Sequence, residues 1–219
     1  EKRRSELDVL QSQINPHFLY NTLDSVVWMT ENGRTQEAVA MLTALARFFR
    51  ISLSKGSSII PIGDEIEHAR NYLTIQKMRY KNKFSADITV EPGVEKLYTI
   101  KLIVQPILEN AIYHGMEYAD GEGEIHIRAF REGEQVIIEV EDNGRGCPVD
   151  WNPKEKRYNW ELVYCELYAG GKYNNLDGDN YEYSLGLNGL GACATQYASR
   201  YMDVTVWRDG NKYSLHFER

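Results

Sequence analysis

The spacing of apolar residues changes near residue 84, and no other feature constrains the fold of this chain as strongly. Before that point, apolar side chains recur every three to four residues, as they do along one face of an α-helix. After it, they alternate with polar side chains over short runs, as they do in half-buried β-strands. Helices followed by intermixed strands and helices are typical of the α+β class.

Three helices are expected in the first part of the chain. The first 55 residues contain one proline, Pro16, and one glycine, which lies in the expected turn Glu31–Gly33 between two helices. A third helix is expected over Asp64–Lys81, with Asp64 as N-cap and Glu67 as the reciprocal acid of a capping box. The positions that suit the seam of a helix bundle are Ala38, Leu42, Leu45, Phe49 and Leu53.

The second part of the chain is expected to contain five strands and two helices. The strands are Phe84–Val90, Glu124–Phe130, Gln135–Glu141, Asp203–Arg208 and Lys212–Glu218. Loops at Arg131–Glu134 and Asp209–Asn211 join two pairs of them into hairpins. Residues Leu102–Gly115 are predicted to form a buried helix, and Asn188–Tyr201 a second helix.

Composition excludes several classes of protein. The net charge of −7, from 25 basic and 32 acidic residues, opposes a broad nucleic-acid-binding surface, and we expect no direct nucleic-acid binding. Cys147, Cys165 and Cys193 form no C-x-x-C pair, which argues against a zinc ribbon or a disulfide framework. No run approaches the ~18 apolar residues of a membrane-spanning helix. Because the chain opens at Glu1, we expect it to be part of a longer protein.

His17 is the first candidate for chemistry. Pro16, inside a helical pattern, removes a backbone donor, so the helix is expected to bend beside His17. A neutral imidazole nitrogen is a nucleophile, and an ordinary pKa of ~6.5 leaves a useful neutral fraction at cellular pH. A lone histidine on a helix is more often only a surface residue, so the surrounding sequence decides.

That surrounding sequence, QSQINPHFLYN at Gln11–Asn21, resembles the phospho-acceptor segment of LytS/YesM-type sensor histidine kinases. The resemblance covers roughly residues 5–146 and continues through Leu45–Arg50, Tyr72–Gln76 and Gln105–Gly115. It implies that His17 accepts the phosphoryl group and that the helices of two subunits pair in a homodimer. The alternative is a helix pair that serves only to dimerise the protein. The resemblance also implies a response-regulator receiver domain as partner. The chain would then be the cytoplasmic portion of a bacterial sensor, attached to the membrane through an upstream segment.

A second candidate is Glu109–Gly115 on the expected buried helix. The amide oxygen of Asn110 is a hard ligand that suits Mg²⁺, and His114 lies one turn later on the same face. A lone asparagine in a helix is more often an exposed amide. The segment resembles the N-box of GHKL ATPases, whose asparagine holds the metal. The resemblance implies ATP and Mg²⁺ as cofactors and marks Glu109, Asn110 and His114 as catalytic.

Two glycine-containing motifs complete the expected nucleotide site. Asp142 ends a strand, where its carboxylate can accept the exocyclic amine of adenine, and Gly144 and Gly146 let the backbone close over the base. This D-x-G-x-G string resembles the GHKL adenine-binding box. Glycines entering a helix expose amides to phosphates, and the segment Gly186–Gly191 fits that role; the alternative is a simple glycine-rich turn. Its expected ATP-binding members are Gly186, Asn188, Gly189, Leu190 and Gly191.

From about residue 142 to residue 219 the sequence instead resembles the ATPase domain of the DNA gyrase B protein and its type II topoisomerase relatives. This resemblance implies that Lys172 approaches the phosphates and Tyr181 the nucleotide. The gyrase pattern has a water-activating glutamate where this chain has Pro106, so weak or absent ATP hydrolysis is expected. Leu185 replaces a glycine of the gyrase lid.

The sequence therefore predicts a helical hairpin followed by a GHKL (Bergerat-type) α/β sandwich with a mixed, largely antiparallel sheet. We expect residues 1–56 to form the phospho-acceptor and dimerisation region, and residues 57–219 the ATP-binding domain, gyrase B-like after residue 146. The predicted function is autophosphorylation by a histidine kinase of a two-component system. The alternatives are a gyrase-like ATP-binding clamp or ATPase, and a nucleotide-binding pseudokinase.

Overall fold

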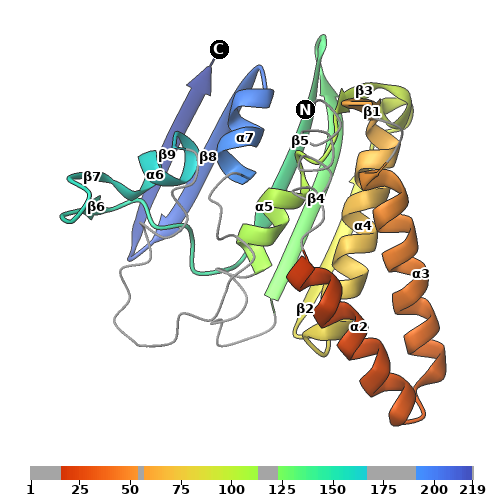
Figure 1. Cartoon of the computed structure of the whole chain (residues 1–219). Helices are drawn as coiled ribbons and strands as arrows, with labels where there is room; N and C mark the ends of the chain where they lie inside the picture. Colours follow the sequence, from red (N-terminus) through yellow and green to blue (C-terminus); the bar gives the residue numbers. More distant parts are fainter. Residues whose placement is uncertain (1–15, 54–56, 113–122, 167–190, 219) are drawn as a thin grey trace, which may run out of the picture. The chain divides into compact units, whose positions relative to one another are not determined.

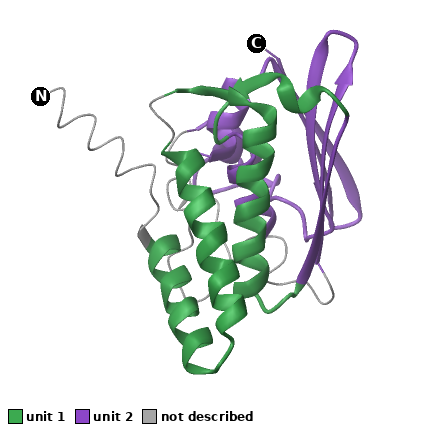
Figure 2. Ribbon diagram, turned by 90° about the vertical axis from the view of Figure 1, so that its right-hand side faces the viewer, with its two compact units in different colours: residues 1–83, 92–102 green, residues 84–91, 103–219 purple. Residues whose placement is uncertain are grey.

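The computed structural model describes residues 16–53, 57–112, 123–166 and 191–218. The chain divides into two compact units, coloured separately in Figure 2. Unit 1 comprises residues 1–83 and 92–102, and unit 2 comprises residues 84–91 and 103–219. The packing thus divides the chain after Lys83, whereas the functional boundary expected at residue 56 stays a prediction.

The described residues of unit 1 form three α-helices, α2 (Pro16–Glu31), α3 (Thr35–Ser52) and α4 (Ile62–Arg79), which lie side by side in Figure 1. Their apolar faces meet in an aromatic core, in which the Phe18 ring lies 5.2 Å from Phe48 and 5.6 Å from Tyr72. The expected turn between the first two helices is confirmed, and Gly33 adopts the left-handed φ of +73° there. A short sheet of β1 (Ile59–Pro61) and β3 (Tyr98–Ile100), with a 3₁₀ turn at Val94–Lys96, completes the unit.

The expected cap of the third helix is wrong. Helix α4 begins at Ile62, two residues before Asp64, and its N-cap residue is Pro61, which makes no side-chain capping bond. The reason is tertiary, because the Ile62 N–H donates to the Leu97 carbonyl at 2.7 Å and so already has a partner.

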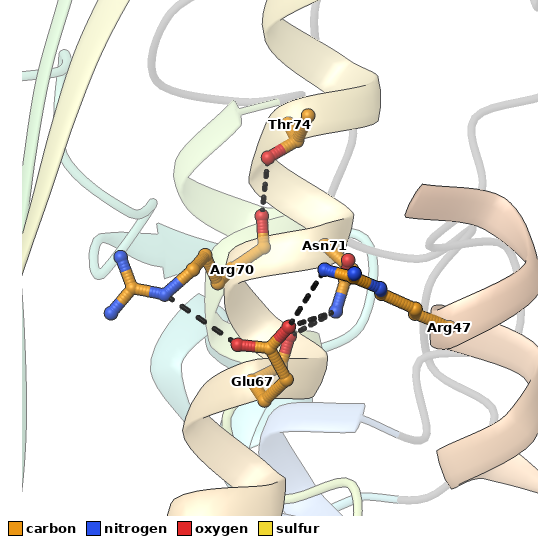
Figure 3. Close-up of polar contacts among 5 residues, drawn as sticks. All are labelled: Arg47, Glu67, Arg70, Asn71 and Thr74. Carbon is orange, nitrogen blue, oxygen red and sulfur yellow. Dashed lines mark hydrogen bonds and ion pairs between the residues drawn. The ribbon is translucent and has the colours of Figure 1, made fainter. Parts of the chain in front are cut away.

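Glu67, which is not needed for capping, forms a polar cluster instead (Figure 3). Its carboxylate accepts a hydrogen bond from Asn71 Nδ2 at 3.1 Å and lies 3.7 Å from Arg70 Nε and 3.9 Å from Arg47 on α3. The last contact joins α4 to α3 at their solvent-facing side, where an ion pair contributes little to stability.

The buried helix expected over Leu102–Gly115 begins later. Leu102 adopts a left-handed φ of +63° and donates its N–H to the buried Glu65 carboxylate at 2.8 Å, so it cannot belong to a right-handed helix. Helix α5 runs from Gln105 to Asn110 and continues into a π-helical turn at 111–112.

Unit 2 contains a three-stranded mixed sheet of β2 (Phe84–Val90), β4 (Gly123–Glu132) and β5 (Gln135–Asp142). Strand β2 runs parallel to β4, and β5 runs antiparallel to it. The alternation seen in the sequence places Ile125, Ile127 and Ala129 of β4 on the buried face. The three strands and their hairpin are confirmed within two residues, and so is the α+β class with a mixed sheet.

A separate hairpin of β8 (Tyr201–Arg208) and β9 (Asn211–Glu218) follows. Asp209 and Gly210 both have positive φ, as a tight two-residue hairpin turn requires. Helix α7 (Gly191–Ala198) is shorter than the expected Asn188–Tyr201, because Tyr201 already belongs to β8; residues 188–190 lie outside the described part. Sequence patterns did not predict β6 (Trp151–Asn152), β7 (Arg157–Tyr158) or α6 (Asn159–Tyr164).

The core beside this hairpin joins α6 and α7. Val163, Tyr164 and Ala192 are buried in it, and side chains of β8 and β9 pack against them. Within the described ranges, no helix combines the length and apolar character needed to cross a membrane.

Candidate functional site

A pocket of about 230 Å³ lies within unit 2, between the end of α5, the loop after β5, and β8. Its walls are partly apolar, from Val140, Val163, Val204 and Val206, and it also has polar members, among them Asn110, Asp142 and Thr205. Pockets for whole drug-sized ligands are larger, about 300–1,000 Å³. The volume therefore fits one flat part of a ligand rather than a whole nucleotide.

Asp142 stands at the end of β5, on the pocket wall. Its Oδ1 accepts the Gly144 N–H at 2.9 Å, which fixes the carboxylate and the start of the loop. Desolvation in the pocket raises the pKa of the Asp142 carboxyl, the Gly144 bond opposes this rise, and the neighbouring Glu141 charge adds to it. The second carboxylate oxygen is left to accept a donor from a ligand, as the sequence predicted for adenine.

The structure explains why residue 146 is a glycine, by a close contact that the sequence did not predict. The φ of Gly146 is +77°, and a Cβ there would lie 2.8 Å from Val206 Cγ1 and 3.0 Å from the Trp207 carbonyl oxygen. The Gly146 carbonyl accepts a bond from Arg208 at 3.0 Å. The glycine thus lets the loop after β5 close against β8, and this contact forms one end of the pocket.

Helix α5 carries Glu109 and Asn110, two of the residues expected to be catalytic. Asn110, its last residue, is half-buried and lines the pocket. Glu109 accepts a hydrogen bond from Gln105 Nε2, one turn earlier, at 2.8 Å. Burial raises the pKa of Glu109 to about 7, and the Gln105 bond opposes that rise. A carboxyl with a pKa near neutrality can exchange a proton at cellular pH.

Gly191 is the first residue of α7 and packs directly on α5. A Cβ at this position would lie 2.4 Å from Pro106 Cβ, closer than side chains approach one another. Thr195 strengthens the same contact, because its hydroxyl donates to the Ile103 carbonyl at 2.9 Å. Pro106 therefore sets how closely α7 approaches α5.

The structure brings four of the predicted residues to one pocket: Asn110, Asp142, Gly144 and Gly146. The predictions for His114, Lys172, Tyr181, Gly186, Asn188, Gly189 and Leu190 fall outside the described residues. Sequence reasoning missed the wall made by Cys147, Tyr164 and Thr205. Burial raises the pKa of the Cys147 thiol to about 11, so it packs as an apolar group and is no nucleophile.

His17 lies on α2 in unit 1 and is exposed to solvent. Its ring is accompanied by Asn21, one turn later, whose Nδ2 lies 3.2 Å from Nδ1. The following residue, Phe18, is buried in the aromatic core and so holds the start of α2 against α3. This arrangement presents the imidazole outward from a fixed helix.

Two family models match the chain. One, described as histidine kinase, matches residues 5–84, and the other, described as histidine kinase-, DNA gyrase B-, and HSP90-like ATPase, matches residues 96–218. The first contains His17, and the second contains every residue of the pocket.

Relatives of known name are sensor kinases. "Sensor histidine kinase YesM" of Bacillus subtilis is 35% identical over 144 residues, which are 66% of this chain and 25% of that protein. "Sensor histidine kinase BtsS" of Escherichia coli is 34% identical over 140 residues, 64% of this chain and 25% of that protein. "Sensor protein LytS" of Bacillus cereus is 29% identical over 143 residues, 65% and 24% of the two chains. The chain thus spans about a quarter of the length of these curated relatives, and the predicted resemblance to this group is confirmed.

Proposed function

We propose that this chain, which belongs to the family of histidine kinase-, DNA gyrase B-, and HSP90-like ATPases, binds ATP in the unit 2 pocket and transfers its γ-phosphoryl group to His17. From the histidine, the group passes to the receiver domain of a response regulator. The observation that carries this proposal is the meeting of Asn110 and Asp142, 32 positions apart in sequence, in one pocket with apolar walls.

The pocket suits the adenine end of ATP. Its valine side chains offer apolar surface to a flat base, and the Asp142 carboxylate would accept the exocyclic amine at the edge of that base. Gly144 fixes that carboxylate through its N–H. The glycine-rich segment 186–190 lies outside the described residues, and binding of the phosphates there stays a proposal from the sequence.

The donor set also fits Mg²⁺. Asn110 contributes a hard amide oxygen at the pocket, and Mg²⁺ usually completes its shell with substrate phosphates and water. When bound, Mg²⁺ would neutralise charge on the phosphates. Glu109, with its pKa near 7, is suited to accept or return a proton beside this site.

Transfer to a histidine requires positioning rather than an activated water, so Pro106 does not impair it. The neutral imidazole of His17 attacks the γ-phosphorus, the bond to the β–γ bridging oxygen breaks, and ADP leaves with the electron pair. Since Pro106 supplies no base for water, we propose that steady ATP hydrolysis is weak. We also propose that the chain belongs to the cytoplasmic portion of a membrane-attached sensor; its relatives are named as sensors.

A labelling experiment tests the function. With γ-³²P-ATP and Mg²⁺, the wild-type chain should acquire acid-labile label, whereas His17→Gln should acquire none while binding ATP normally. Asp142→Ala should bind ATP ~10–100-fold more weakly, because a hydrogen bond to a charged group contributes about 1.5–3 kcal/mol. Label on His17→Gln would show that another residue is the acceptor. ATP turnover without phosphohistidine would favour the gyrase-like ATPase instead.

We further propose a homodimer, through a seam that differs from the one expected from sequence. Ala38 and Leu45 are buried within unit 1, whereas Val39, Leu42 and Leu53 on α3 are 58, 42 and 43% exposed. Exposed Tyr20, Leu23 and Val27 form a similar stripe on α2. Together these residues offer a second copy an apolar surface.

Leu42→Glu should therefore weaken dimerisation at least tenfold, because it puts a charge in an apolar interface. Ala40→Glu adds the same charge at an exposed position off the stripe of α3 and is the matched control. Light scattering coupled to gel filtration measures the mass at several concentrations. Equal dissociation of the two variants would place the interface elsewhere.

A further inference from the structure

The hairpin of β6 and β7 in unit 2 is fixed by two buried asparagines. Asn152 Oδ1 accepts the N–H groups of Lys154 and Glu155, each at 3.1 Å, and these bonds close the turn at the tip. The Nδ2 of Asn152 donates to Asn159 Oδ1 at 3.0 Å, and both asparagines are buried. The hairpin is therefore held in one conformation, and a partner that binds it does not have to order it first.

Two aromatic side chains of this hairpin are half exposed. Trp151 and Tyr158 are cross-strand partners, their rings lie 5.2 Å apart in an edge-to-face arrangement, and they are 51 and 46% exposed. The Tyr158 ring also stacks on Trp160 at 6.5 Å, and the Trp160 ring lies 6.2 Å from Phe217, beside the core of α6 and α7. The exposed rings are thus the outer end of a series of rings that is anchored in that core.

The charge of the hairpin is opposite to the charge of the chain. From the start of β6 to the end of β7 the sequence contains three basic residues and one acidic residue, whereas the whole chain has a net charge of −7. Lys154 and Lys156 are exposed, and the acidic residue, Glu155, is half-buried. Arg157 is paired with Glu166. Two exposed cations therefore accompany the two exposed rings, and together they complement an anionic partner that also has apolar surface.

We propose that this hairpin binds the surface of a membrane that contains anionic lipids. Indole and phenol rings combine an apolar body with a polar N–H or O–H, and they are enriched where a bilayer meets water. Lysine side chains beside the rings would bind the lipid phosphates, while their alkyl stems lie along apolar surface. Peptide segments are commonly held in grooves, whereas β6 and β7 form a projection beside α6 (Figure 1), which a lipid surface can accept.

Three substitutions separate this contact from the stability of the hairpin. Trp151→Ala removes the larger exposed ring. Lys156 has a left-handed φ of +55°, so Lys156→Gly removes a cation and relieves the backbone at the same time. Asp150→Asn removes the exposed acidic side chain next to Trp151. Trp28→Ala is the matched control, because Trp28 on α2 is 48% exposed and has the Arg34 guanidinium 5.4 Å from its ring centre.

Sedimentation of the full chain with vesicles of phosphatidylcholine that contain about 30% phosphatidylglycerol measures the binding. We expect affinity to fall at least tenfold in Trp151→Ala and about fivefold in Lys156→Gly, although Lys156→Gly should be as stable as wild type in urea or more stable. Asp150→Asn should bind more tightly, and Trp28→Ala should bind like wild type. Raising the salt concentration from ~50 to ~200 mM should weaken the binding of every variant.

Equal binding of wild type and Trp151→Ala, or equal binding to vesicles with and without phosphatidylglycerol, would overturn the proposal. Failure of the wild-type chain to bind at low salt would also overturn it. If soluble poly-L-glutamate bound tightly through the same residues, the partner would be an acidic protein segment instead. Among the described residues that line the pocket of unit 2, none belongs to this hairpin, so vesicle binding and phosphohistidine formation can succeed or fail separately.

Discussion

Lowering the pH from 6.5 to 4 should destabilise unit 1 by about 3 kcal/mol through His68 alone. This histidine lies on α4 and has none of its surface exposed. Its ring stacks on Phe48 of α3 at 4.3 Å, and its Nε2 lies 2.8 Å from Ser52 Oγ. Burial lowers the pKa of His68 from 6.5 to about 4, because the charged ring would lose its hydration.

The surroundings of the ring decide where we assign its proton. Ser52 Oγ lies 3.0 Å from the Phe48 carbonyl and 2.8 Å from His68 Nε2, and we assign the proton to Nε2 because a proton on Nδ1 would be a buried donor without an acceptor among the described residues. Nδ1 then carries the lone pair, and it has no hydrogen-bond partner among the residues that the structure covers. A proton added at Nδ1 would be a buried donor without an acceptor.

The sign of the pH dependence follows from this depressed pKa. Between pH 6.5 and pH 4 the unfolded chain binds a proton at His68 that the folded chain does not. The contribution to stability is therefore complete above pH 6.5 and is lost as the pH falls toward 4. At about 1.4 kcal/mol per pH unit, the change from 6.5 to about 4 gives the stated ~3 kcal/mol.

Urea unfolding of the full chain, followed by helical circular dichroism at pH 7.5, 6.5, 5.5 and 4, measures this dependence. His68→Gln keeps a donor near Ser52 and cannot titrate, so it should be less stable at pH 7.5 but should lose ~3 kcal/mol less on acidification. Carboxylates titrate in both proteins, and their effect cancels in the comparison. Parallel pH profiles would show that His68 is not the acid-sensitive group.

Some elements of the fold could be predicted from the sequence, and others could not. The strand Phe84–Val90 and the hairpin after Tyr201 follow from local alternation and turn residues, and local patterns are visible in a sequence. The start of α4 and the late start of α5 depend on Leu97 and Glu65, which are distant in sequence from the residues they bind. Local patterns do not contain such partners, so the expected cap of α4 and the expected start of α5 were wrong.

The candidate site likewise contains residues that sequence motifs predict and residues that they do not. Asn110, Asp142, Gly144 and Gly146 stand in recognisable strings, because their chemistry or backbone geometry requires particular residue types. The opposite wall comes from β8, whose Thr205 and Val206 look like ordinary strand residues. They become part of a site only because Gly146 brings the loop against that strand, which is a tertiary fact.

A single methyl group at Gly191 should have the second large effect. Alanine normally stabilises a helix relative to glycine, by ~1 kcal/mol, so helix propensity predicts that Gly191→Ala stabilises α7. We expect destabilisation by about 1–3 kcal/mol instead, because the added Cβ would lie 2.4 Å from Pro106 Cβ and must push α7 from α5. If the pocket binds ATP as proposed, this displacement of α7 from α5 should also weaken nucleotide binding, since Asn110 is the last residue of α5.

The contact can be isolated by a double-mutant cycle. Pro106→Gly removes the opposing Cβ, so Gly191→Ala should cost little in that background. Pro106→Ala also removes the ring but keeps its Cβ, and there the cost should persist. Unfolding in urea gives both coupling energies, and calorimetry with ATP gives the effect on binding. If Gly191→Ala costs the same stability in both backgrounds, the close approach to Pro106 is not the reason that α7 begins with glycine. A role in phosphate binding would then be the better explanation for this residue.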